Sequence, residues 1–445
     1  MKKYKKIVIL DSVILYPEHR YRLNLLADEI VEYNTCYSEE EVLERVKGAD
    51  CVISCWVDIS NRVIDENPQI KTIAFWTHAY EHRIDKQYAE SHGIYVPCIP
   101  DYGTDSVAEL AIMGMLNVKA RDNSGEMRLA DEELVMRIAN SIRNFNKNVR
   151  DNLTGHWTHE YVKTGNLKIT DPNYFKEETM KGMTVGLMLA QESINNDLVK
   201  ILAQGFKMNV IHCCCDIVYT LDASFRPVEN LIEESNVLVY DSKLVSPDTL
   251  EKIKKGVFVD AIDIQDITCS GSSIKGKTLG IIGLGRIGTR VAQLATQGFG
   301  MKVQYYSRTR KPEIEKCYGI EYVDIDTVLS SSDFISFHLP HVGAEDFITR
   351  EMVEKIPAGT TVINVSVGNI MQDQDYFLSR FAKDDLDGYI DVYKTMPPRP
   401  ELRARKEQLI STFRLGWRTK STVGLKTHKL ITKLGLDNPD VKKDH

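Results

Sequence analysis

The sequence of 445 residues contains no apolar run long enough to cross a bilayer, which argues against an integral membrane protein. It also has no excess of positive charge, since 63 acidic residues outnumber 56 basic ones and give a net charge of −7. Nucleic-acid binders present a basic surface, so this balance argues against a nucleic-acid partner. The first apolar run ends at Asp11, too early for a secretion signal, and we interpret it as a buried strand.

The nine cysteines include no CxxC pair. Their odd number and the missing secretion signal favour reduced thiols and a cytoplasmic location. Three cysteines are consecutive, at positions 213, 214 and 215. Neighbouring residues on a strand point to opposite faces, so these three cannot easily converge on one ion. We predict buried strand cysteines there and no metal site in the chain.

Short apolar runs alternate with helical stretches over the first hundred residues, which predicts an α/β fold with a parallel sheet. The predicted strands cover residues 6–10, 51–54, 72–75 and 94–96, and a helix covers residues 39–47. Two longer helices are predicted further along, through residues 107–115 and around residues 131–148.

An internal repeat follows these helices. Residues 181–188 (KGMTVGLM) resemble residues 275–282 (KGKTLGII). Three more pairs of segments agree in the same order: 205–208 with 298–301, 234–239 with 331–336, and 251–256 with 354–359. The offsets lie between 93 (298 − 205) and 103 (354 − 251), as short loop insertions would produce. We infer two successive βαβ-type units that share an ancestor; the alternative is chance similarity between two such units.

The second copy carries a glycine-rich turn, GLGRIG, directly after an apolar strand and before a helix. In such a turn Gly283 permits the tight bend, Gly285 lets the backbone approach a pyrophosphate, and Gly288 allows close packing of helix on strand. The free N–H groups at the helix start, around Arg286 and Ile287, would hold the anion. The motif predicts a bound dinucleotide; the alternative is a purely structural turn.

The next strand ends at Ser307, Arg308 and Thr309, about where an acidic residue would bind the ribose hydroxyls in an NAD site. A guanidinium with neighbouring hydroxyls suits a phosphorylated ribose, so the cofactor is NAD or NADP, with a slight preference for NADP; a solvated charged loop is the alternative. The first copy reads LAQESI at residues 189–194, without a glycine, and is predicted to bind no dinucleotide.

Together these segments resemble the D-isomer-specific 2-hydroxyacid dehydrogenases over most of the chain. The resemblance rests on residues 107–109, 275–288, 332–340, 362–366 and 388–392 and, more weakly, on residues 412–419. It implies a flavodoxin-like substrate domain, a Rossmann coenzyme domain, an active site in the cleft between them, and a homodimer. It also implies that His338, Leu339, Pro340 and Val365 lie against the cofactor, and that Asp391 orients the nicotinamide amide.

The organisation expected from the repeat and the resemblance has four parts. A flavodoxin-like substrate-type domain covers residues 1–117 and is completed by residues 401–445. Interdomain helices and a linker occupy residues 118–180, the degenerate Rossmann-like repeat residues 181–267, and the NAD(P)-binding Rossmann domain residues 275–400.

The chain departs from the family at the three positions that carry its chemistry. The positions of the substrate-clamping Arg, the supporting Glu and the proton-transferring His hold Val367, Met396 and Arg414. Valine and methionine cannot bind a carboxylate or support a proton transfer. Arg414 is a permanent cation that can hold an anionic substrate but cannot shuttle protons near neutral pH. We therefore do not expect ordinary 2-hydroxyacid dehydrogenase activity.

Other candidate catalytic residues are His78 and His82, where the family has a substrate loop, and His341, just beyond the predicted cofactor loop. The alternative for each is a surface or core histidine. With Arg414, they favour an NAD(P)-dependent oxidoreductase with a rebuilt active site and a small anionic substrate. Two alternatives remain: a non-catalytic NAD(H)-sensing or scaffold protein, and an enzyme that uses tightly bound NAD as a transient internal oxidant.

Overall fold

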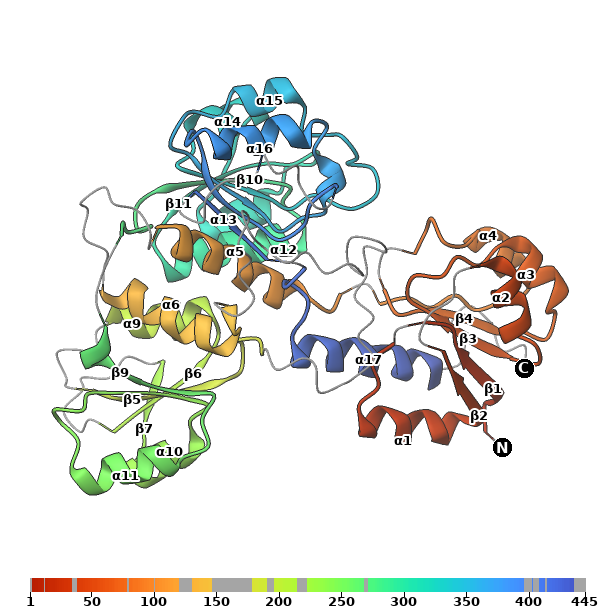
Figure 1. The fold of residues 1–445 in the computed structure, drawn as a ribbon, viewed down its shortest axis with the longest axis horizontal. Helices are drawn as coiled ribbons and strands as arrows, with labels where there is room; N and C mark the ends of the chain where they lie inside the picture. Colours follow the sequence, from red (N-terminus) through yellow and green to blue (C-terminus); the bar gives the residue numbers. More distant parts are fainter. Residues whose placement is uncertain are drawn as a thin grey trace. The chain divides into compact units, whose positions relative to one another are not determined.

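The computed structural model describes residues 2–11, 13–33, 38–77, 80–99, 101–119, 130–145, 178–189, 196–213, 222–267, 271–395, 402, 408–412 and 414–435. The chain divides into two compact units (Figure 1). Unit 1 consists of residues 1–102, 158–176 and 420–445, and unit 2 of residues 103–157 and 177–419. Unit 2 therefore includes residues 103–117 and 401–419, which the sequence assigns to the substrate domain.

Unit 1 contains one parallel sheet in the order β2-β1-β3-β4, the order of a flavodoxin-like fold. Its strands are β1 (Tyr4–Ile9), β2 (Ala27–Glu32), β3 (Cys51–Ser54) and β4 (Thr72–Phe75). Every residue of β3 and β4 is buried, as expected for central strands covered on both faces. The stretch predicted as a strand at residues 94–96 forms only isolated bridges, from Tyr95 to Thr72 and from Cys98 to Phe75.

Helices complete unit 1: α1 (Pro17–Leu26), α2 (Glu39–Arg45), α3 (Asn61–Glu66), α4 (Lys86–Ser91) and α17 (Lys420–Gly435). Ser38 caps α2 by accepting the N–H of Glu41, which fixes the start of the predicted helix. Helix α17 returns the chain to this unit, where the indole N–H of Trp76 donates to the hydroxyl of Thr427 over 2.9 Å.

Unit 2 contains two parallel sheets, and the repeat predicted from sequence is visible in their topology. The first copy has the strand order β7-β6-β5-β8-β9, and the second has β12-β11-β10-β13-β14 followed by two more strands, β15 and β16. The first sheet consists of β5 (Thr184–Met188), β6 (Asn209–His212), β7 (Ala223–Phe225), β8 (Val237–Tyr240) and β9 (Asp260–Asp263). The second consists of β10 (Thr278–Ile282), β11 (Lys302–Tyr306), β12 (Glu321–Tyr322), β13 (Phe334–Phe337), β14 (Thr361–Asn364), β15 (Asp387–Ile390) and β16 (Leu409–Ser411).

The two copies also share local hydrogen bonds. The N–H of Thr184, which begins β5, donates to the side chain of Asn236 over 2.8 Å. The N–H of Thr278, which begins β10, donates to the side chain of Asp333 over 2.7 Å. In both copies the first helix ends in a π-helical turn, η3 (Lys200–Gly205) or η5 (Leu294–Gly298). An additional Rossmann-like unit is therefore part of the fold.

Each copy in unit 2 carries further helices. The first copy has α9 (Asn196–Val199), α10 (Val228–Glu234), α11 (Pro247–Lys255) and the short η4 (Ile264–Asp266). The second has α12 (Arg286–Gln293), α13 (Pro312–Tyr318), α14 (Ile325–Ser331), α15 (Arg350–Glu354), η6 (Gly368–Ile370) and α16 (Gln374–Ala382).

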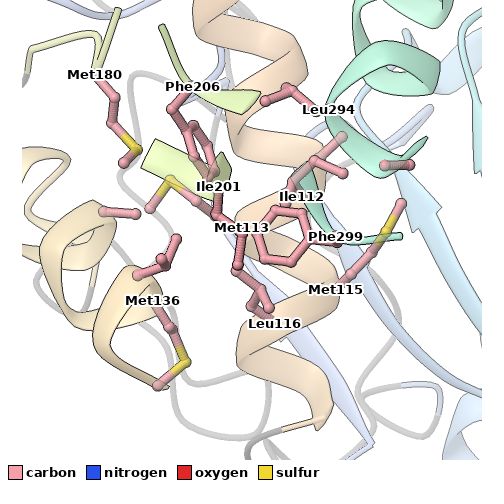
Figure 2. Close-up of a cluster of buried hydrophobic side chains, with 14 of the residues drawn as sticks. Ile112, Met113, Met115, Leu116, Met136, Met180, Ile201, Phe206, Leu294 and Phe299 are labelled. Atoms are coloured by element: carbon pink, nitrogen blue, oxygen red, sulfur yellow. The ribbon is translucent and has the colours of Figure 1, made fainter. Parts of the chain in front are cut away.

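Two long helices, α5 (Thr104–Lys119) and α6 (Ala130–Ile142), lie between the two sheets of unit 2 (Figure 1). Nearly all of α5 is buried, because its side chains contact both copies. Figure 2 shows the centre of this core, where side chains from the helices and from both copies meet: Ile112, Met113, Met115, Leu116, Met136, Met180, Ile201, Phe206, Leu294 and Phe299.

The first of the three consecutive cysteines, Cys213, lies just beyond the strand in which it was predicted. Strand β6 ends at His212, and Cys213 follows it half-buried, while Cys214 and Cys215 lie outside the described residues. Within the described part of the chain, no helix is long and apolar enough to span a membrane. The same residues contain no group of three His, Cys, Asp or Glu side chains that could hold a metal ion.

Candidate dinucleotide site

The predicted cofactor residues of unit 2 lie at one edge of its larger sheet. They follow the carboxyl ends of β10, β11, β13, β14 and β15, which are parallel neighbours and therefore end on the same side. The chain runs outward from β10 to β11 and β12 on one side, and continues through β13 on the other. Such a switch point leaves a crevice where α/β proteins bind ligands.

The glycine turn has the shape that a pyrophosphate requires. Gly283 has a φ of +98°, and a Cβ there would lie 2.5 Å from the carbonyl oxygen of His338. A Cβ on Gly288 would lie 2.2 Å from the carbonyl oxygen of Gly283. Gly285 is exposed, and a Cβ on it would meet no described atom within 4 Å. Packing thus demands glycine at two positions, and the third leaves open the approach that a phosphate needs.

Helix α12 begins directly after this turn, with Gly285 as its N-cap residue. Its first internal hydrogen bond runs from the N–H of Thr289 to the carbonyl of Gly285 over 2.9 Å. The N–H groups of Ile287 and Gly288 precede that bond, at the positive end of the helix dipole, where anions bind. The residues of the second copy therefore fit a dinucleotide pyrophosphate.

The first copy has lost this cradle. Its strand β5 is followed by Leu189, which is 6% exposed and stands where the second copy has Gly283. Residues 190–194 of the expected glycine-free turn lie outside the described residues. The first copy therefore lacks the glycine that permits the tight bend at the start of the turn in the second copy.

The predicted ribose loop follows β11. Ser307 is half-buried, whereas Arg308 and Thr309 are exposed. The neighbouring Arg310 is bound by Glu315, with Nη2 and Oε2 2.8 Å apart. The N–H of Gly283 donates to the carbonyl of Tyr306 over 2.9 Å, so this loop and the glycine turn are tied together. Arg308 is therefore the cation of this loop that can meet a ribose phosphate.

The loop after β13 is also tied to the glycine strand. The N–H of His338 donates to the carbonyl of Ile282 over 2.8 Å, and its Nε2 lies 2.8 Å from the hydroxyl of Ser336. Burial lowers the pKa of His338 to about 3, so its ring is neutral at physiological pH. The N–H of Leu339 donates to the hydroxyl of Ser366 over 2.9 Å. Pro340 is exposed and Val365, after β14, is half-buried.

Asp391, after β15, is 2% exposed and holds the turn that follows β16. Its carboxylate accepts the N–H groups of Leu415 over 2.8 Å and Gly416 over 3.0 Å, and also the hydroxyl of Thr412. From the other side, the fully buried guanidinium of Arg143 donates to the carbonyl of Leu415 over 2.9 Å and that of Gly416 over 3.2 Å. Sequence reasoning singled out neither Arg143, which acts on the backbone of a turn far away in sequence, nor the hydroxyl of Thr412, which acts on the distant carboxylate of Asp391.

Two of the three departures from the family, Val367 and Arg414, lie at this edge. Val367 is half-buried and directly precedes Gly368, where a Cβ would lie 2.0 Å from the backbone nitrogen of Lys394. The loops after β14 and β15 are therefore in close contact. Arg414 is half-buried, and its N–H donates to the carbonyl of Asp391 over 2.9 Å. Met396 lies outside the described residues.

The four predicted catalytic residues do not all belong to this edge. His341, beyond the β13 loop, is exposed, and its carbonyl accepts the side-chain amide of Asn369 over 3.1 Å. Arg414, after β16, lies at the same edge of the sheet. His82 belongs to unit 1, where it lines a surface pocket with Trp56. His78 lies outside the described residues.

Comparisons with known proteins agree with this site. Residues 248–413 match the family model of the D-isomer specific 2-hydroxyacid dehydrogenase, NAD binding domain. The glyoxylate reductase of Thermococcus litoralis is 63% identical over 130 residues, which are 28% of this chain and 38% of that protein. The hydroxypyruvate reductase of Thermotoga maritima is 32% identical over 174 residues, which are 37% of this chain and 56% of that protein. The chain thus spans between 38% and 56% of these relatives.

A solved structure extends the likeness to the whole fold. The apo D-lactate dehydrogenase of Escherichia coli aligns over 97% of this chain and 96% of its own, with a TM-score of 0.53 and 15% identity. Fold and glycine turn define a dinucleotide-binding α/β protein. Residues 248–413 therefore match the NAD-binding domain of the D-isomer-specific 2-hydroxyacid dehydrogenases, and this match supports NAD or NADP as the cofactor.

Proposed function

We propose that this chain is an NAD(P)-dependent oxidoreductase that reduces a small anionic carbonyl compound in a rebuilt active site. The contrast between its two copies carries the proposal. The first copy builds the same five-strand order with Leu189 in place of a glycine, so the fold itself does not require the glycine turn. The second copy retains all three glycines and keeps Gly285 open. Packing accounts for Gly283 and Gly288, and the retained Gly285 is explained by a ligand.

The substrate class follows from the relatives and from the charges at the site. The relatives are named for the reduction of glyoxylate and hydroxypyruvate, which are small 2-oxo acids. Such a substrate carries a carboxylate, which in this chain would meet the permanent cation Arg414 instead of an arginine at position 367. The Nε of Arg414 is buried and has no hydrogen-bond partner among the described residues, so this side chain has donors left for an anion.

The reaction needs one hydride and one proton. NAD(P)H held by the glycine turn would supply the hydride chemistry, and an acidic group of the chain would have to give a proton to the carbonyl oxygen of the substrate. His338 cannot serve, because its low pKa keeps it neutral. We propose His341 as the donor from the cofactor-binding unit, and His78 and His82 as the candidates from the other unit.

A second candidate function is NAD(H) sensing without turnover. It is favoured by the three hydrogen bonds that commit the Asp391 carboxylate to the turn around Thr412 and Gly416. A carboxylate so engaged has less capacity left to orient a nicotinamide amide. Val367 likewise gives a substrate carboxylate nothing to bind.

The experiment is to follow the oxidation of NADH and of NADPH with glyoxylate, hydroxypyruvate and a wider panel of small 2-oxo acids. Turnover that disappears in a Gly285→Val variant would support the oxidoreductase. Tight binding of the dinucleotide without turnover across the panel would support the sensor. Turnover that is unchanged by substitution of His78, His82, His341 and Arg414 would contradict our choice of residues.

A further inference from the structure

Helices α5 and α6 are themselves related to each other. Three residues of α5 recur in α6, each 23 positions later in the sequence (132 − 109, 136 − 113 and 140 − 117). The pairs are Glu109 and Glu132, Met113 and Met136, and Asn117 and Asn140. Helix α5 packs on α12 of the second copy, and α6 packs on α9 of the first. Each copy of the Rossmann unit therefore has its own copy of the helix.

Asn117 and Asn140 make the same contact in both directions. The side-chain amide of Asn117 donates to the side-chain oxygen of Asn140 over 2.9 Å, and that of Asn140 donates to the oxygen of Asn117 over 2.9 Å. Equivalent residues that exchange identical bonds are characteristic of an interface with a local two-fold axis.

The two glutamates accept equivalent backbone hydrogen bonds from the two copies. Glu109 accepts the N–H groups of Met180 and Lys181, over 3.0 and 3.1 Å, at the start of the first copy. Glu132 accepts the N–H groups of the residues at positions 274 and 275, over 3.2 and 3.1 Å, at the start of the second. These acceptor sites are 94 positions apart (274 − 180), which is the offset of the repeat itself.

The ends of the first helices of the two copies also meet at this axis. Phe206 and Phe299 pack edge to face, with ring centroids 6.0 Å apart. The adjacent Gly205 and Gly298 approach so closely that a Cβ on Gly205 would lie 3.1 Å from the Cα of Gly298. Figure 2 shows Phe206 and Phe299 in the same cluster of side chains as Ile201 and Met113. The contact joins equivalent residues of the two copies, as a two-fold interface does.

The part formed by α5 and the second copy is interrupted in sequence at one point, where the chain leaves it and later returns. The N–H of Ser272 donates to the carbonyl of Lys119, the last residue of α5, over 3.0 Å. Helix α6 and the first copy lie between these two residues in sequence. Insertions are tolerated where the two ends of the inserted segment lie close together. Helix α6 and the first copy are therefore an insertion at a single site of the part formed by α5 and the second copy.

We propose that α6 and the first copy form a built-in partner, which covers the face through which the coenzyme unit would otherwise associate with a second chain. The interface has the reciprocal contacts of an isologous dimer, yet both of its sides belong to one chain. A face filled in this way cannot bind another copy. The chain is then a monomer with one dinucleotide site, because the partner copy has the buried Leu189 where the glycine turn requires Gly283 for its tight bend. This is an alternative to the homodimer that the family resemblance implies.

The first test measures the mass of the full-length protein by light scattering, at several concentrations, together with the number of NADH or NADPH molecules bound per chain. We expect a particle of 50.6 kDa with one dinucleotide. A stable particle of twice this mass would overturn the proposal that the insertion replaces a second chain. Two dinucleotides per chain would overturn the assignment of the first copy as a partner without a site. The mass does not depend on the proposed reductase activity, so the two proposals can fail separately.

The second test is a double-mutant cycle across the axis, with Asn117→Ala, Asn140→Ala and the double variant, measured by urea unfolding. Each single substitution leaves the other amide without its partner, so each should lower the urea midpoint, and the double variant should lower it by less than the two shifts added together. Asn230→Ala, at an exposed position of α10, combined with Asn140→Ala serves as the control and should be additive. Additive shifts for Asn117 and Asn140 would contradict the reciprocal contact.

Discussion

A Cβ added to Gly288 would lie 2.2 Å from the carbonyl oxygen of Gly283, so the first turn of α12 packs directly on the end of β10. Gly285, between them, has open space where its side chain would be, and its φ of −79° is accessible to any residue. The glycine turn thus contains positions that packing requires to be glycine and one that only a ligand requires.

This difference predicts opposite behaviour for two substitutions. Gly285→Val should leave thermal stability nearly unchanged, because the added atoms meet open space, and should weaken NADH or NADPH binding by at least about tenfold, or ~1.4 kcal/mol. Gly288→Ala should instead lower the melting temperature. Calorimetric titration with the dinucleotide and thermal unfolding of both variants would check this. Normal affinity in Gly285→Val would show that the turn does not hold the pyrophosphate.

The choice between NAD and NADP should depend on Arg308. Arg308→Glu should weaken binding of NADPH more than of NADH, since it places a carboxylate beside the ribose phosphate. Arg310→Ala is the matched control, because Arg310 is already bound by Glu315 and should affect both dinucleotides equally. The ratio of the two dissociation constants is the measurement. An unchanged ratio in Arg308→Glu would remove this residue from the ribose site.

The repeat and the glycine turn could be predicted because both are local in sequence. The segments around Lys181 and Lys275 resemble each other in order, and the strands predicted before the glycine turn and before Ser307 are present as β10 and β11. The stretch at residues 94–96 shows the limit of this reasoning. Its apolar pattern is that of a strand, but whether it pairs depends on its neighbours, and only isolated bridges form.

The contacts that hold the two Rossmann copies and their helices α5 and α6 together could not be predicted in this way. The likeness of Glu109 to Glu132 and of Asn117 to Asn140 is present in the sequence, but it consists of a few polar residues among apolar ones. Such residues stand out only when their partners are known. The same holds for Asp391, whose hydrogen bonds to the turn at Gly416 join residues far apart in the chain.

Asp391 should contribute to stability whatever its part in cofactor binding. Asp391→Asn keeps the size of the side chain but replaces one acceptor oxygen by a donor, which cannot satisfy the N–H groups of both Leu415 and Gly416. We expect a loss of about 1–3 kcal/mol in the free energy of unfolding. Urea unfolding would measure it, with the exposed Asp384→Asn as the control. Unchanged stability would mean that the carboxylate is not needed to hold this turn.

Glu109 should make stability depend on pH. Burial raises its pKa from 4.5 to about 7, although the N–H groups of Met180 and Lys181 and the charge of Arg143 oppose this shift. The folded state then binds a proton more tightly than the unfolded state between these values. The contribution of Glu109 to the free energy of unfolding therefore falls as the pH rises from 4.5 to about 7.

Urea unfolding at a series of pH values would check this expectation. Glu109→Gln should flatten the profile between the two pKa values, since the amide does not titrate. The exposed Glu313→Gln reports the effect of removing a carboxylate alone. A profile for Glu109→Gln that parallels the wild type would contradict the raised pKa.

Arg414 allows substrate binding to be separated from stability. Its φ of +49° lies in the left-handed region, where a residue other than glycine, asparagine or aspartate is strained by about 1–2 kcal/mol. Arg414→Asn should therefore keep or raise the melting temperature. It also removes the guanidinium, and the loss of a charged hydrogen bond worth about 1.5–3 kcal/mol should raise the KM for a small 2-oxo acid about tenfold or more. Arg414→Lys, which keeps the cation, should show a smaller rise in KM without the gain in stability. A KM that stays unchanged in Arg414→Asn would exclude Arg414 from the substrate site. The two effects can be separated, because the backbone strain changes the melting temperature whereas the lost contact to the substrate charge changes the KM.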